Sequence, residues 1–121
     1  AEDLSEGSAR NRAVAEAVSE WADRNALEAG DYVTSLPAGE QRDAAVGAYA
    51  RRIADEDPTA AVDWALSIEG EALRNSTLTS TVREWMRRDP AAAGQWVEGS
   101  GLPESVVTEI SRPRDDRGRR R

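Results

Sequence analysis

Apolar side chains recur along this sequence at spacings of three and four residues, which is the pattern of amphipathic helices that bury one face. The pattern predicts three long helices over about residues 8–24, 40–54 and 72–88. A shorter stretch with the same spacing follows each of them. The positions predicted to be buried in the long helices are Val14, Ala17, Val18 and Trp21; Ala45, Val46, Tyr49, Ala50 and Ile53; and Leu78, Thr81, Val82 and Trp85.

Two of the shorter stretches begin almost identically, with DPTAAVDW at residues 57–64 and DPAAAGQW at residues 89–96. Aspartate is a favourable N-cap, and proline is tolerated in the first turn because that turn needs no backbone donor. A turn sequence follows each short stretch: LPAG at 36–39, IEGE at 68–71 and GLPE at 101–104. The motif therefore predicts the start of the short helix in a helical hairpin.

The offset of 32 residues between these two copies extends over most of the chain. It relates aromatic, capping, alanine and arginine positions, and a fixed offset of this length indicates a repeat architecture. The related sets are Trp21, Ile53 and Trp85; Asn25, Asp57 and Asp89; Ala29, Ala61 and Ala93; Tyr32, Trp64 and Trp96; and Arg10, Arg42 and Arg74.

A hairpin of this size cannot bury its apolar stripe alone, so neighbouring hairpins must cover it. The predicted fold is all-α, a right-handed stack of about three helical hairpins that forms an α-solenoid with a 32-residue repeat. The predicted repeat domain spans residues 1–111, and the rest of the chain is predicted to be a basic disordered tail at 112–121. Within the domain, the units are expected at about 8–36, 40–68 and 72–100, with a partial cap at 103–111.

The first residues also fit the repeat, because Ala1 aligns with Val33 and Ala65. The alignment predicts that the chain starts within the remains of a short helix, in front of a long helix that begins near Ser8. Such a start would leave the N-terminal face of the first unit open, and self-association through that face is expected.

The pattern W-x-x-x-D-P-x-A-A-x-x-W, followed by a Leu-Pro-x-Gly-like turn and an Arg-led helix, resembles tandem repeats of large uncharacterised bacterial proteins. The resemblance covers roughly residues 4–110, and its first copy departs from the pattern with Asn25-Ala26 in place of Asp-Pro. In general shape it is also similar to tetratricopeptide-like α-solenoids, although the residue offsets of that motif are not matched. The resemblance implies stacked hairpins and a scaffold, and it carries no catalytic residue.

The amino-acid composition excludes several kinds of catalytic and ligand-binding site. The chain has no Cys and no His, and all of its 16 basic residues are Arg. Thiolate nucleophiles, the usual general base, Schiff-base lysines and Lys-containing phosphate loops are therefore excluded. No spacing fits a calcium loop, no metal or cofactor is expected, and no apolar run approaches the roughly 20 residues of a membrane span. The protein is expected not to be an enzyme, although carboxylate-only acid–base catalysis stays open as an alternative.

Two groups of residues could form a functional site, but the sequence pattern favours a structural role for both. The four tryptophans recur in register with the apolar stripe, so core packing is predicted for them rather than an aromatic cage. Arg51 and Arg52 precede Asp55 and Glu56 by four residues, which predicts ion pairs on a helix surface.

The expected function is that of a non-catalytic protein-interaction or scaffolding module, because solenoids present an extended surface built from one helix of each pair. The partner is expected to be another protein or a peptide, bound by exposed arginines of the long helices: Arg42, Arg51, Arg52, Arg74, Arg83, Arg87 and Arg88.

The alternative function is association with nucleic acid through the C-terminal tail, whose candidate contacts are Arg114, Arg117, Arg119, Arg120 and Arg121. The net charge of −7 argues against this alternative, because an acidic body repels phosphates. The lysine-free, Ala-rich composition indicates a bacterial protein from a GC-rich genome. The protein is expected to be soluble, in a cytoplasmic or extracytoplasmic compartment that the sequence does not specify.

Overall fold

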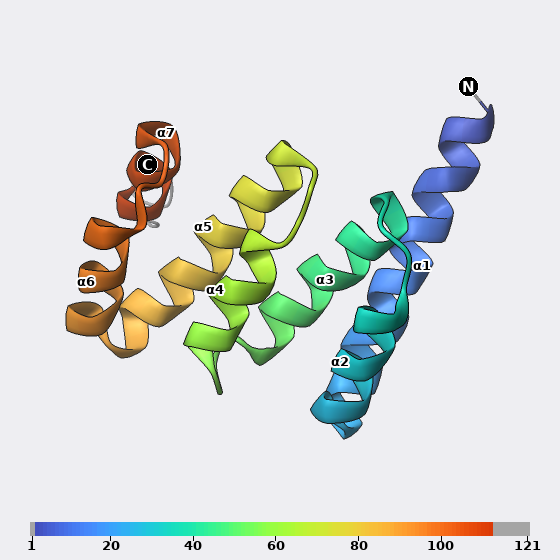
Figure 1. Ribbon diagram of the computed structural model, residues 1–121, viewed down its shortest axis with the longest axis horizontal. Helices are drawn as coiled ribbons and strands as arrows, with labels where there is room; N and C mark the ends of the chain where they lie inside the picture. The colour runs from blue at the N-terminus through green and yellow to red at the C-terminus, as the bar shows by residue number, and fades with distance from the viewer. Residues whose placement is uncertain (1, 113–121) are drawn as a thin grey trace, which may run out of the picture.

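The computed structural model describes the backbone of residues 2–112 and the side chains of residues 9–112. This part of the chain is all-helical, with seven helices and no strand (Figure 1). The helices are α1 (Glu2–Arg24), α2 (Ala26–Ser35), α3 (Glu40–Ile53), α4 (Pro58–Leu66), α5 (Glu71–Arg88), α6 (Pro90–Ser100) and α7 (Glu104–Ser111).

The helices succeed one another along the longest axis of the molecule, from α1 at one end to α6 and α7 at the other (Figure 1). Helix α1 packs against α3, α3 against α5, and α5 against α7. Each of the shorter helices α2 and α4 lies against the two long helices that flank it in the chain, whereas α6 packs mainly on α5. Contacts therefore run between neighbours in the sequence, and α1 and α7 stand at opposite ends.

The three short helices start in the same way. Asn25, Asp57 and Asp89 each accept a hydrogen bond from the backbone N–H three residues later, at 3.1, 3.2 and 3.2 Å. These side chains satisfy one of the donors that the first turn of a helix leaves without a partner. Asn25 does this as Asp does, so the first copy of the motif forms its short helix despite the missing Asp-Pro.

Residues that are one or two repeats apart, by 32 or 64 positions, also make equivalent contacts. The rings of Trp21 and Tyr32 lie 5.2 Å apart, and those of Trp85 and Trp96 lie 6.2 Å apart. The hydroxyls of Ser35 and Ser67 each donate to a carbonyl three residues earlier, both at 2.6 Å. The sequence offset thus corresponds to recurring local geometry in the described helices.

The apolar side chains form two clusters that meet at α4. The first joins α1 to α4 around Val18, Val33 and Val46, and the second joins α4 to α7 around Leu78, Val82 and Trp85. The sequence correctly assigned the buried positions of α3 and α5. Of the tryptophans, Trp85 is buried, whereas Trp21, Trp64 and Trp96 are partly buried against the clusters.

Two expectations for the first helix are wrong. Helix α1 runs without interruption from Glu2, so no separate short helix precedes a long helix starting near Ser8. Gly7 stays within the helix, whereas the turns elsewhere use a positive φ at Gly39 and Gly101. Ala17 is exposed rather than buried, because α1 is the first helix of the row and packs only on its α2 and α3 sides.

Candidate partner-binding surface

Three open depressions lie between successive long helices. The first, between α1 and α3, has a volume of about 600 Å³. The second, between α3 and α5, measures about 330 Å³, and the third, between α5 and α7, about 490 Å³. Together they form what is called here the long-helix surface, whose lining includes Arg12, Glu16, Ser19, Glu20, Ala48, Arg51, Arg52, Asp55, Ser80, Glu84, Ser105 and Glu109.

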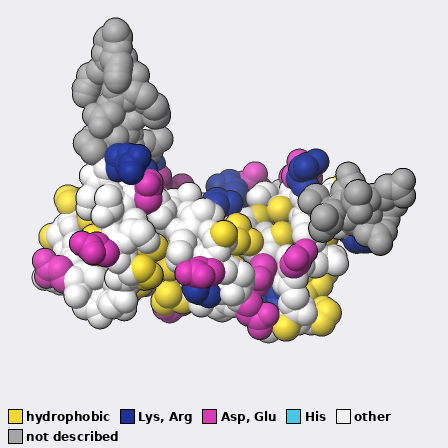
Figure 2. All heavy atoms as spheres, turned by 90° about the horizontal axis from the view of Figure 1, so that it is seen from above, with side chains coloured by type: hydrophobic (Ala, Val, Ile, Leu, Met, Phe, Trp, Pro, Cys, Tyr) yellow, Lys and Arg dark blue, Asp and Glu magenta, His cyan; other side chains and the backbone are white. Residues whose placement is uncertain are grey.

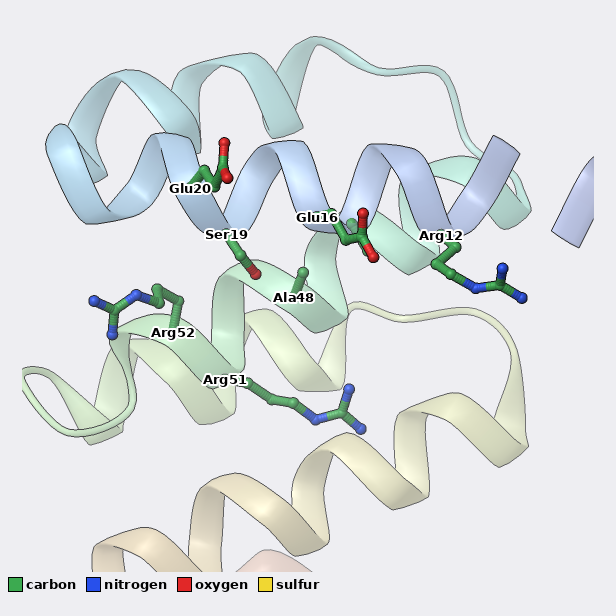
Figure 3. Close-up of a pocket in the computed structure, with 8 residues that line it drawn as sticks. Arg12, Glu16, Ser19, Glu20, Ala48, Arg51 and Arg52 are labelled. Carbon is green, nitrogen blue, oxygen red and sulfur yellow. The ribbon is translucent and has the colours of Figure 1, made fainter. Parts of the chain in front are cut away.

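The depressions are joined to one another by shared side chains. Arg51 and Arg52 of α3 line both the first and the second depression, and Ser80 of α5 lines both the second and the third. In Figure 3 both arginines extend from α3, across the first depression from Glu16 and Glu20 of α1. The three depressions are therefore parts of one surface that crosses four helices.

The chemistry of this surface is that of small residues between charged ones. Ala15, Ser19 and Ala48 line the first depression, and Ser80 and Thr81 line the second. Arginines and carboxylates surround them, and Figure 2 shows basic and acidic side chains interspersed over the face seen from above. Small side chains leave room for a ligand backbone, and Arg offers a planar fork of donors for a carboxylate.

The seven arginines predicted to bind a partner do not act as one group. Arg51 and Arg52 line the long-helix surface, and Arg52 also pairs with Asp23 of α1. Arg87 pairs with Glu84 on its own helix, Arg83 donates to the carbonyl of Arg112 at 2.6 Å, and Arg88 is exposed.

The predicted pairing of Arg51 and Arg52 with Asp55 and Glu56 does not occur. Helix α3 ends at Ile53, so the two carboxylates lie in the turn that follows and not on the next turn of the same helix. The partner that Arg52 finds instead comes from α1. A separation of four residues allows ion pairs along a helix, but α3 ends before it reaches Asp55 and Glu56.

Arg42 and Arg74 occupy equivalent sequence positions and have different surroundings. Arg42 lines a separate depression of about 260 Å³ between α3 and α4, together with Asp63, Trp64 and Ser67. The guanidinium of Arg74 donates to the carbonyls of Ile68 and Glu69, at 3.1 and 3.3 Å. Arg74 therefore holds the turn between α4 and α5, and this contact makes it a structural residue.

Asp43 holds the same turn from the other side. Its buried carboxylate accepts hydrogen bonds from the backbone N–H groups of Glu69 and Gly70, at 3.1 and 3.0 Å. Gly70 is the N-cap residue of α5 and makes no side-chain cap, and Asp43 of α3 binds the N–H of Gly70 itself and that of the preceding residue. One carboxylate thereby fixes where the next long helix begins.

Replacing Asp43 with alanine should lower the free energy of unfolding by about 1.5 kcal/mol, because two backbone donors lose a charged acceptor. Urea denaturation followed by circular dichroism measures this change. Asp63→Ala is the matched control, since Asp63 is exposed on α4 and a surface change of this kind costs less than about 0.5 kcal/mol. Equal losses in both variants would contradict the capping role of Asp43.

Several surface residues were missed by the sequence-based interpretation. Arg12, Glu16 and Ser19 lie on α1 and contribute to the first depression together with residues of α3. A helical wheel could have placed these three near one side of α1, but the repeat positions drew attention to Arg10 instead. The tail arginines Arg114, Arg117, Arg119, Arg120 and Arg121 lie outside the described residues.

The described residues were also searched for a metal site, a membrane-spanning helix and titratable groups with a shifted pKa. Among the described side chains, those of residues 9–112, no group of three or more Asp and Glu residues is placed to hold a metal ion. No described helix is both long and apolar enough to cross a membrane. The buried phenol of Tyr49 has its pKa raised by desolvation, and Asp31 and Asp57 raise that pKa further. Tyr49 therefore stays protonated and donates to the carbonyl of Ala26 at 2.9 Å, which is a packing role.

No protein-family model matches the chain, and comparisons with curated proteins and with solved structures find no similar protein.

Proposed function

We propose that this protein is a non-catalytic interaction or scaffolding module, built as an α-solenoid of about three hairpins with a 32-residue repeat. The recurring caps of Asn25, Asp57 and Asp89 support the repeat, as do the equivalent aromatic pairs. The order of helix contacts, each with its neighbours along the chain, is typical of stacked repeats.

The observation that carries the proposal is the continuity of the long-helix surface. A surface lined by four helices and joined at Arg51, Arg52 and Ser80 suits an extended segment of a partner protein better than a compact small molecule. Arg51 stands where the first two depressions meet and is exposed, so it is placed to receive a carboxylate of the partner. These three depressions are open, whereas a small-molecule site usually buries most of the surface of its ligand.

Site-directed photocrosslinking in the native extract tests this proposal. A benzophenone amino acid is placed at Ser19 or Ser80 on the long-helix surface, or at Glu98 on α6 as a control position. A defined partner protein should be captured from Ser19 and Ser80 and not from Glu98. Capture from all three positions alike would contradict the proposed surface.

Charge reversal supplies the second arm of the same experiment. Arg51→Glu should reduce the captured partner by about ten-fold, which corresponds to roughly 1.4 kcal/mol of binding free energy. Arg88→Glu is the matched control, because Arg88 is also an exposed arginine but does not line the three depressions. Equal capture by the two variants would remove Arg51 from the site.

The alternative, nucleic-acid association, draws on the five arginines between residues 114 and 121. Its signature is an affinity that falls steeply with salt, because binding then rests on released counterions. Nuclease treatment of the extract separates the two functions, since a protein partner survives it and a nucleic-acid bridge does not.

A further inference from the structure

The two walls of the first depression carry opposite charges. Glu16 and Glu20 stand on α1, and Arg51 and Arg52 stand on α3 (Figure 3). All four side chains are exposed. Among the ion pairs of the described residues, only the pair of Arg52 with Asp23 involves any of these four. The acidic wall and the basic wall therefore face solvent side by side, with most of their charges uncompensated within the described part of the chain.

The charged positions of the two walls also lie level with one another. Helices α1 and α3 run in the same direction, and residues 32 positions apart face each other across the depression (Figure 3). Glu20 thus lies level with Arg52, and Glu16 lies level with Ala48. The side chain of Arg51 extends back along α3 toward the level of Glu16. Each glutamate therefore has a guanidinium group at its own height on the opposite wall.

This arrangement makes the depression complementary to itself. A two-fold interface brings the same patch of two subunits together, so the patch must match its own rotated copy. A second copy, turned by 180° about an axis parallel to α1 and α3, places its α1 over α3 of the first copy and its α3 over α1. Glu16 then meets Arg51 of the second copy, and Glu20 meets Arg52. Because of the symmetry, each of these contacts forms twice.

The floor and the net charge of the depression both favour this approach. Ser19 of α1 and Ala48 of α3 lie between the two walls, and their small side chains leave room for a second pair of helices. The charged residues that line the depression are three arginines and two glutamates, a net charge of +1, whereas the whole chain carries −7. Two copies of this acidic protein therefore repel each other less at this place than across an average part of their surfaces.

We propose that the first depression is a dimer site, at which the acidic α1 wall of one copy of the protein binds the basic α3 wall of a second copy. The dimer occupies Arg51, so it competes for this residue with the partner protein of the proposed function. The inference does not rest on that function, because it concerns the purified chain alone. The two can therefore fail separately.

Sedimentation equilibrium of the purified full chain tests the dimer at protein concentrations up to roughly 1 mM, which as a Kd corresponds to about 4 kcal/mol. The mean mass should rise with concentration from 13.1 kDa toward twice that value. The rise should be weaker in 1 M salt, where the Debye length falls to about 3 Å and exposed charge pairs are screened.

Two charge reversals locate the interface. Glu16→Arg or Arg51→Glu alone brings like charges together at both symmetry-related contacts, so each should weaken the dimer at least about ten-fold. In an equimolar mixture of the two variants every such contact again joins opposite charges, and the mass of a dimer should return. Glu98→Arg and Arg88→Glu are the matched controls: they change the net charge equally, at exposed positions outside the depression, and should leave the dimer unchanged.

Circular dichroism checks that each variant keeps its helices, as expected for exposed positions. The inference is wrong if the unmodified chain stays at 13.1 kDa at all these concentrations. It is equally wrong if a dimer forms that Glu16→Arg and Arg51→Glu leave intact, which would assign self-association to another face, such as the N-terminal face of the first unit. A mixture of the two variants that stays monomeric would also overturn it, because the pairing of the two walls requires the heterodimer.

Discussion

Replacing Trp85 with alanine should lower the free energy of unfolding by about 3–5 kcal/mol, the largest loss expected from any single change in this protein. Trp85 is only 6% exposed and belongs to the cluster that joins α4, α5, α6 and α7. Its ring also pairs with that of Trp96 at 6.2 Å. Removing it deletes the one aromatic side chain that is buried in this cluster.

Urea denaturation measured by circular dichroism at 222 nm suits this variant, because the signal comes mainly from the helical backbone and does not rely on tryptophan fluorescence. Trp96→Ala is the matched control, since it breaks the same aromatic pair from the partly exposed side. Its loss should be less than half that of Trp85→Ala, because less area leaves water when Trp96 packs. Similar losses would mean that the aromatic pair, and not the burial of Trp85, supports the second cluster.

The helices were predictable because their signals are local. The caps at Asn25, Asp57 and Asp89 and the prolines that follow two of them specify helix starts within four residues. The spacing of apolar residues likewise specified the buried faces of α3 and α5. Local chemistry decides both features, so no knowledge of the neighbouring helices was needed.

The candidate site was harder to predict because it depends on distances between helices. Arg51 and Arg52 were identified as exposed, but their position between α1 and α5 follows from the packing of three helices. The contact of Asp43 with Glu69 and Gly70 spans 26 and 27 residues and has no local signature. The sequence predicted Arg74 to be an exposed contact residue. Its two acceptors are backbone carbonyls, which no sequence pattern identifies.

Replacing Gly30 with alanine should lower the free energy of unfolding by about 2 kcal/mol, within the range of overpacked sites. The added Cβ would stand 2.7 Å from the hydroxyl oxygen and 3.1 Å from the Cζ atom of Tyr49. Tyr49 cannot move aside cheaply, because its ring packs edge-on against Trp64 at 5.1 Å and its hydroxyl bonds to Ala26. Thermal and urea unfolding both report the loss.

Two further variants identify the cause of that loss. Gly94→Ala makes the same change at the equivalent, open position and should stabilise the protein slightly, by up to about 1 kcal/mol, because alanine favours helices over glycine. Tyr49→Phe removes the atom nearest to the new methyl group, so the double variant Gly30→Ala/Tyr49→Phe should lose about 1 kcal/mol less than the two single losses added together. If the two single losses in unfolding free energy simply add in the double variant, the glycine at position 30 matters only for α2 itself and not for contact with Tyr49. Coupling of this size would show instead that Tyr49 of one hairpin and Gly30 of the previous one form a single contact, which has no counterpart at Gly94 among the described residues.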